Sequence, residues 1–205
     1  GDPAAVPTPR DGTVEVLSTR DIRPRLVTAL AAAEPGDRIR AASTWFSDRE
    51  LLDAFVAAAD RGADVQLLTD DLHGLPLGPV PSWFVRRLAN LRVIDRARRL
   101  QRPGFELRIH ASSAGRMMHL KTAAFLGRHR RFLIGGQANY TPNSFSGAWL
   151  ETGLVVGDAP HVIDAFLDQF DQLWSASAPP RADHRITRAA HKTLLSLVEK
   201  TVFRF

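Results

Sequence analysis

The segment RMMHLKTAAFLGRHRRFLIGGQANY, residues 116–140, decides how the rest of the chain is interpreted. Its two apolar runs, HLKTAAFL and RFLIGG, are joined by the basic turn GRHRR, which predicts two neighbouring strands. His119 and Lys121 are two residues apart in the first run. Because alternate side chains of a strand share a face, we expect both to point the same way, followed by Ala123 and Phe125.

The sequence before this segment alternates between strand patterns and helix patterns. Three short stretches have the composition of strands, namely residues 13–18, 38–43 and 64–70. Asp21 is a candidate N-cap for the helix after the first strand. Ser47 and Glu50 have the spacing of a capping box for the helix after the second strand. This order predicts an α/β fold in which a mixed, mainly parallel sheet lies between helices.

The middle of the chain is less regular. Residues 83–90 have the pattern of a short helix, and an Arg-rich segment follows it. Seven arginines lie between Arg86 and Arg102, opposed by a single carboxylate, Asp95. This cluster is either a solvated helix face and loop or a rim that binds anions, and the sequence leaves both interpretations open.

The second half adds strands and helices that complete one domain. Strands are expected at residues 105–110 and 149–158, and an amphipathic helix at residues 159–177. We therefore divide the chain into a flexible leader, one α/β domain and a C-terminal helix that packs on the domain or on a partner. These parts are residues 1–12, 13–178 and 179–205.

Composition limits the chemistry that the chain can use. A chain of 205 residues is long enough for one domain with a substantial core. It has no cysteine, which excludes disulfides and thiolate metal sites, and its histidines lack metal-ligand spacing. We therefore expect neither a metal nor a cofactor. A chain that begins with Gly and lacks Cys is compatible with an exported protein as well as a cytoplasmic one, so the sequence leaves the location unknown.

The charge balance favours anionic partners. The formal net charge is +5 and the pI about 10.6, and only three of the 27 basic residues are lysine. Such a balance suits nucleic acid or acidic lipid. An arginine content this high in an alanine-rich chain is also compatible with codon bias, so the charge alone does not establish a function.

The His-Lys pair and the residues after it resemble the phospholipase D superfamily. The signature of that family is His-x-Lys, four residues, Asp, then a Gly-Ser-x-Asn turn, and a Glu at the start of the next strand. His119 and Lys121 match the triplet. Gly136 and Asn139 match the turn, and Glu151 matches the later acid. With the helices on either side, the resemblance covers most of the chain.

Two positions depart from the signature. Leu126 stands where the family has the motif aspartate, and Gln137 replaces the usual serine of the turn. Either the enzyme works with an altered signature, or the pocket binds an anionic nucleic acid or lipid without turnover. The resemblance favours the enzyme.

The resemblance implies a metal-independent, two-step phosphodiester reaction. His119 would attack phosphorus to form a phosphohistidine, and a second histidine would protonate the leaving group. Lys121 and Asn139 would hold the non-bridging oxygens, and Glu151 would orient His119 through a hydrogen bond. The residues expected to contact substrate are Gly136, Gln137 and Ser144.

The resemblance also implies a partner. Members of the family place two such motifs around one site, and this sequence carries one. We therefore expect a homodimer, or a site completed by a missing half. The substrate would be a phospholipid or a nucleic acid, and both hydrolysis and phosphatidyl transfer remain open. The apolar C-terminal helix could also contact an anionic membrane.

Overall fold

The computed structural model describes residues 12–71, 81–100, 102–111, 117–157 and 159–180. The flexible leader and the C-terminal helix expected from residue 184 lie almost wholly outside these ranges, so both stay predictions. Within the described ranges, no helix is both long enough and apolar enough to cross a membrane.

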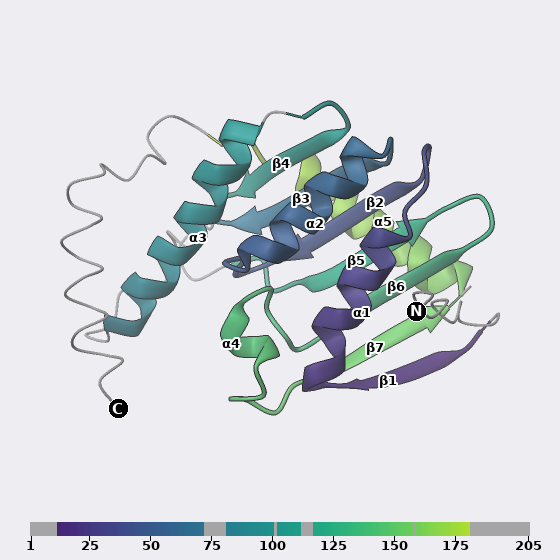
Figure 1. Cartoon of the computed structure of the whole chain (residues 1–205), viewed down its shortest axis with the longest axis horizontal. Helices are drawn as coiled ribbons and strands as arrows, with labels where there is room; N and C mark the ends of the chain where they lie inside the picture. Colours follow the sequence, from purple (N-terminus) through teal and green to yellow (C-terminus); the bar gives the residue numbers. More distant parts are fainter. Residues whose placement is uncertain (1–11, 72–80, 101, 112–116, 158, 181–205) are drawn as a thin grey trace, which may run out of the picture.

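One sheet forms the centre of the molecule, as Figure 1 shows. Its seven strands lie side by side in the order β1-β7-β6-β5-β2-β3-β4. The strands are β1 (Val14–Ser18), β2 (Arg38–Ser43), β3 (Asp64–Asp70), β4 (Phe105–His110), β5 (Lys121–Leu126), β6 (Arg131–Gly136) and β7 (Thr152–Gly157). The helices are α1 (Thr19–Ala31), α2 (Arg49–Asp60), α3 (Pro81–Leu100), α4 (Pro142–Phe145) and α5 (Pro160–Ser175).

Five strands run in one direction, and β5 and β7 run against them. The parallel pairs are β2 with β3 and β3 with β4. Each of the other pairings includes β5 or β7 and is antiparallel. The prediction of a mixed α/β sheet between helices is confirmed, but the two reversed strands leave parallel pairing in only part of the sheet.

Helices cover both faces of the sheet (Figure 1). In front, apolar side chains of α1, α2 and α3 pack on the sheet, with Leu26, Phe55 and Ile94 fully or almost fully buried. Behind it, α5 packs Ile163 and Phe170 on the opposite face. Helix α5 supplies one apolar stripe along its length, as the amphipathic pattern predicts.

Helix α3 corrects the prediction for the middle of the chain. It does not stop at residue 90 but continues through the Arg-rich segment to Leu100. Val93, Ile94 and Ala97 are buried on its inner side, while Arg98 and Arg99 both pair with Asp95. Arg96 and Arg99 are exposed on a helix whose apolar residues have helical spacing, so this part of the cluster is a solvated face.

The N-caps of α1 and α2 also differ from the prediction. Helix α1 follows β1 without a loop, and Ser18 is its N-cap, while Asp21 accepts the Ser18 hydroxyl. The N-cap of α2 is Asp48, whose carboxylate accepts the Leu51 amide at 2.9 Å. The helix begins at Arg49, so Ser47 lies one residue before the cap position, and the Tyr140 carbonyl accepts the amides of both Ser47 and Asp48.

A buried amide joins α3 to the sheet. Asn90 is 2% exposed, and its Oδ1 accepts the backbone N–H of Phe46. Its Nδ2 donates to the Asp70 carbonyl at 3.0 Å and lies 3.3 Å from the Thr44 carbonyl. Since these partners follow or end β2 and β3, Asn90 fixes α3 relative to that edge of the sheet.

Candidate functional site

One edge of the sheet collects the chain positions that the sequence analysis selected. Ser43, the last residue of β2, pairs with Lys121, the first residue of β5. Asn139 lies three residues beyond the end of β6, and Glu151 directly precedes β7. Because β5 and β7 are reversed, their starts lie beside the ends of their neighbours.

Lys121 carries a buried ammonium group. Its side chain lies on the same face of β5 as Ala123 and Phe125, and the residue is 7% exposed. Its Nζ has no hydrogen-bond partner in the part of the chain that the structure describes. Burial lowers the pKa of Lys121 from 10.5 to about 8, and the Glu151 carboxylate partly opposes this shift. A desolvated, unpaired cation is costly and is stabilised when an anion binds.

The surroundings of Lys121 are tightly packed. It lines a cavity of about 10 Å³ together with Ile22, Leu26 and Tyr140. The Tyr140 hydroxyl is also buried, makes no hydrogen bond with the described residues, and has its pKa raised by burial. A space of this size holds about one water molecule, so a phosphate must approach the ammonium from outside this cavity.

Hydrogen bonds of the backbone after Asn139 fix the position of this residue. It is 6% exposed, and its Oδ1 has no hydrogen-bond partner among the described residues. The next residue, Tyr140, donates its N–H to Ser43 Oγ at 3.1 Å and accepts the amides of Ser47 and Asp48 at 2.9 and 3.0 Å. These bonds tie Asn139 to the end of β2, beside Lys121.

Glu151 is fixed by its backbone. Thr19 Oγ1 accepts the Glu151 N–H at 2.7 Å and donates to the Glu151 carbonyl at 2.9 Å. The half-buried carboxylate acts on Lys121, whose pKa it raises. The expected hydrogen bond from His119 to this carboxylate is not formed within the described residues, so its role in orienting the imidazole stays a prediction.

His119 lies just before β5, not within it. The strand begins at Lys121, whereas His119 is exposed and lines a cavity of about 280 Å³ with His110, Met118 and Leu173. Burial lowers the pKa of His119 below its ordinary value, and the Lys121 ammonium lowers it further. The ring is therefore kept neutral to lower pH than usual, which is the form that a nucleophile needs.

The segment that carries His119 is anchored by a buried carboxylate that the sequence analysis missed. Asp70, the fully buried last residue of β3, accepts the Met118 N–H through Oδ2 at 2.8 Å. His110, which ends β4, shares the cavity of His119, and its Nδ1 is buried with no hydrogen-bond partner among the described residues. Asp70 and His110 each occupy the last position of a predicted strand. An acid or a histidine at such a position is the sequence pattern that could have identified them.

The structure separates the three residues expected to contact substrate. Ser144 is fully buried and receives the Thr141 hydroxyl at 3.1 Å, so it belongs to the cap of α4 and not to an open pocket. Gly136 has a φ of +150°, and a Cβ there would lie 2.2 Å from the Thr152 carbonyl oxygen. It therefore permits close packing of β6 on β7. Gln137 is exposed, and its backbone N–H donates to the same Thr152 carbonyl.

Leu126 is far from the other motif residues. It is the last residue of β5 and packs against the apolar layer under α5, on the face opposite Lys121. The two are five positions apart along the strand, or about 17 Å. The missing aspartate therefore leaves no gap beside the Lys121 ammonium.

The described residues contain no group of three or more His, Cys, Asp or Glu side chains that could hold a metal ion. The chemistry available at this edge is that of a neutral imidazole, a buried ammonium, an amide and a carboxylate. Such a set can attack phosphorus and stabilise negative charge on phosphoryl oxygens.

Comparison with known proteins gives one family and several similar folds. A family model described as "Cardiolipin synthase, PLD-like domain" matches residues 26–174. No curated protein matches the sequence. The fold is similar to Nuc from Salmonella typhimurium, a phospholipase D family member, with a TM-score of 0.59 and 18% identity over 84% of this chain and 100% of that one.

Two further structures are similar. NucT from Helicobacter pylori has a TM-score of 0.62 and 16% identity over 83% of this chain and 100% of that one. Phosphatidylserine synthase from Haemophilus influenzae Rd KW20 has a TM-score of 0.61 and 13% identity over 94% of this chain and 46% of that one. At these identities the likeness concerns the fold.

Replacing Lys121 by Met is expected to stabilise the protein. The folded chain releases the Lys121 proton near pH 8 and the unfolded chain near 10.5, so the free energy of unfolding of the wild type rises with pH between these values. Below pH 8 the buried cation is present and costs stability. We expect Lys121→Met to raise the free energy of unfolding at pH 7 by about 1 to 3 kcal/mol and to abolish the rise.

Urea unfolding from pH 7 to 10.5 measures this effect. Arg128→Met, which removes an exposed cation from the turn between β5 and β6, is the control and is expected to change stability by less than about 0.5 kcal/mol. A loss of stability in Lys121→Met, or the same pH dependence as the wild type, would show that the ammonium is not strained.

Proposed function

Because the chain belongs to the phospholipase D superfamily, we propose that it is a phosphodiester hydrolase or transferase that works through a covalent phosphohistidine at His119. The observation that carries this proposal is the buried, unpaired ammonium of Lys121 at the sheet edge that also holds His119, Asn139 and Glu151. A site that keeps an uncompensated cation in its wall is prepared for an anion.

In the first step, a ring nitrogen of neutral His119 attacks phosphorus. The N–P bond forms while the bond from phosphorus to the leaving oxygen breaks, and a second imidazole donates a proton to that oxygen. In the second step, that imidazole takes a proton from water or an alcohol, whose oxygen attacks phosphorus as the N–P bond breaks. These two steps restore free His119, and neither step requires a metal ion.

Lys121 and Asn139 act on the phosphoryl oxygens. The ammonium is closest to full charge when a phosphate lies beside it, because an anion raises the pKa that burial has lowered. The Asn139 amide is buried and fixed through Tyr140, so it can donate to an oxygen with little loss of side-chain freedom.

The second imidazole is expected to come from His119 of a second copy of the chain. Trp149 and Leu150, directly before Glu151, are 42% and 96% exposed. Apolar side chains beside a polar site favour contact with another protein surface. The same exposure would suit a lipid surface, and His110 is an imidazole of the same chain that shares the His119 cavity.

The non-catalytic alternative draws on Leu126 and Gln137. The distance of Leu126 from Lys121 weakens this alternative, because the departure from the signature lies outside the set of groups that would contact the phosphate. Turnover therefore remains the better proposal.

Labelling of the enzyme tests the covalent step. Wild-type protein, mixed in a single turnover with an oligonucleotide or with bis(para-nitrophenyl) phosphate, is expected to form an acid-labile, alkali-stable adduct that mass spectrometry places on His119. His119→Ala should abolish the adduct, and Lys121→Met should slow it by about 100- to 1,000-fold. His129→Ala, which removes an exposed histidine from the turn between β5 and β6, should leave it unchanged. Absence of an adduct with these and with phosphatidylglycerol vesicles would exclude the mechanism.

Light scattering tests the shared site. We expect the wild type to have the mass of a dimer. Leu150→Asp is expected to shift the mass toward that of the monomer, and to slow formation of the adduct in proportion to the loss of dimer. Leu150 is almost fully exposed, so this substitution should leave the fold of one chain intact. A wild type that is a monomer at all concentrations and still forms the adduct would contradict a site shared between two copies.

A further inference from the structure

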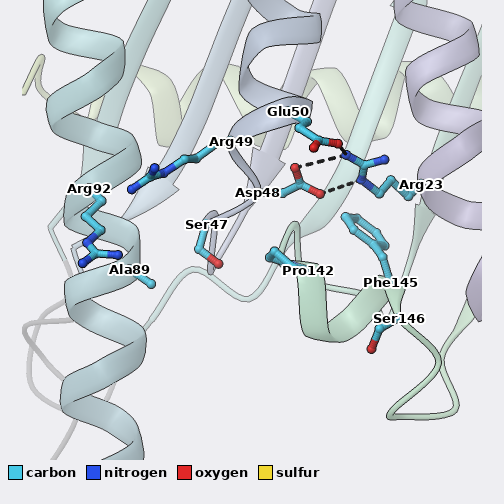
Figure 2. Close-up of a pocket in the computed structure, with 10 residues that line it drawn as sticks. All are labelled: Arg23, Ser47, Asp48, Arg49, Glu50, Ala89, Arg92, Pro142, Phe145 and Ser146. Atoms are coloured by element: carbon cyan, nitrogen blue, oxygen red, sulfur yellow. Dashed lines mark hydrogen bonds and ion pairs between the residues drawn. The ribbon is translucent and has the colours of Figure 1, made fainter. Parts of the chain in front are cut away.

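A large cleft lies beside the candidate site and is separate from it. It has a volume of about 670 Å³ and is lined by side chains from α1, α2, α3 and α4, as Figure 2 shows. Pro142, three residues after Asn139, forms part of its wall. Ser47 also lines it and donates its N–H to the carbonyl of Tyr140, the residue that follows Asn139. The cleft and the site therefore share the short segment 139–142 as a common wall.

The two acidic groups of the cleft bond the same arginine. The Arg23 guanidinium bonds Asp48 through Nε at 2.7 Å and Glu50 through a second nitrogen at 2.5 Å. Figure 2 shows this group on the side of the cleft next to α1. Asp48 also caps α2, so its carboxylate is held by the Leu51 amide as well. Arg23 therefore balances one of the two carboxylate charges on this side of the cleft.

The opposite side of the cleft is cationic. Arg49 begins α2, is exposed, and makes no ion pair or side-chain hydrogen bond with the described residues. Arg92 lines the cleft from α3, and in Figure 2 the Arg49 side chain extends toward that helix. An anion in this space would pair with the exposed Arg49 guanidinium. The first turn of α2 adds the positive end of its dipole.

The hydroxyl groups of Ser47 and Ser146 also lie in the lining. Guanidinium forks and hydroxyls are the groups that bind phosphate oxygens. Pro142, Phe145 and Ala89 complete the cleft and form the apolar part of its wall.

We propose that this cleft binds a second phosphate of the substrate through Arg49 and Arg92, and that the substrate is therefore a single-stranded nucleic acid. A nucleic acid strand carries a phosphate at every nucleotide, so a phosphate next to the reacting one can enter the cleft while the reacting one lies at Lys121. Basic grooves that follow the backbone are the usual means of holding such strands. The inference rests on the proposed phosphodiester chemistry, because it takes the reacting phosphate to lie at the sheet edge.

Binding measurements on the full-length chain test the cleft. The probes are a fluorescent oligothymidylate of about twelve nucleotides, a dinucleotide with one phosphodiester, and phosphatidylglycerol vesicles. In the wild type we expect the oligothymidylate to bind more tightly than the dinucleotide. The affinity for the oligothymidylate divided by the affinity for the dinucleotide is the affinity ratio. Arg49→Ala is expected to reduce this affinity ratio by about 5- to 10-fold, and to lower the slope of log K against log salt by about 0.7, the value for one phosphate contact on a single strand.

Arg128→Ala is the matched control. It removes the same charge from an exposed position in the turn at the other end of β5, and it should leave the affinity ratio unchanged. An equal fall in both variants would mean that only net charge matters, and would overturn the proposal. A fall in vesicle binding with no change for the oligothymidylate would overturn it in favour of a lipid head group.

The His119 adduct separates failure of this inference from failure of the proposed function. If the wild type forms the adduct and Arg49→Ala keeps the full affinity ratio, the cleft proposal is wrong and the phosphodiester chemistry stands. If no adduct forms but the ratio falls only in Arg49→Ala, the chain binds strands through the cleft without the proposed reaction.

Discussion

Strands β5 and β7 run against the other five strands, and the position of each candidate site residue depends on this reversal. A strand that enters the sheet at the edge where its neighbours leave it brings its first residue beside their last residues. Lys121 thus meets Ser43, and Glu151 reaches Thr19, which follows β1. The segment from Asn139 is then tied to the same edge by Tyr140. Local hydrogen bonds complete the arrangement, but the strand directions make it possible.

This arrangement costs stability at one position. Lys121 points into the face covered by α1 and α2, next to side chains that are fully apolar, such as Ile22 and Leu26. Glu151 is near enough to affect its pKa but does not form an ion pair with it within the described residues. A chain under no constraint other than folding would place an apolar residue there, because a desolvated cation without a partner opposes folding. The buried cation is explained if an anionic substrate pairs with it during function.

Much of the fold follows from local patterns, and the differences have long-range causes. The bounds of β2, β3, β4 and β6 agree with their apolar alternation. The extension of α3 was missed because arginines hide the helical spacing of its few apolar residues. The cap of α2 was misplaced by one residue because Ser47 and Asp48 are both suitable cap residues, and it is the Asp48 carboxylate that accepts the Leu51 amide. The motif predicted His119, Lys121, Asn139 and Glu151, whereas the burial of Ser144 and the cleft at Arg49 depend on elements that meet only in the folded chain.

The charge state of Lys121 tests the central claim, which is that this edge keeps an uncompensated cation for an anionic substrate. The chain has three lysines, so the ¹³Cε resonances of labelled protein can be followed one by one, with Lys121→Met assigning the signal. The account predicts one lysine that titrates near pH 8 and whose pKa rises when inorganic phosphate is added. If instead all three titrate near 10.5 and none responds to phosphate, the ammonium is neither buried nor prepared for an anion, and the account is wrong.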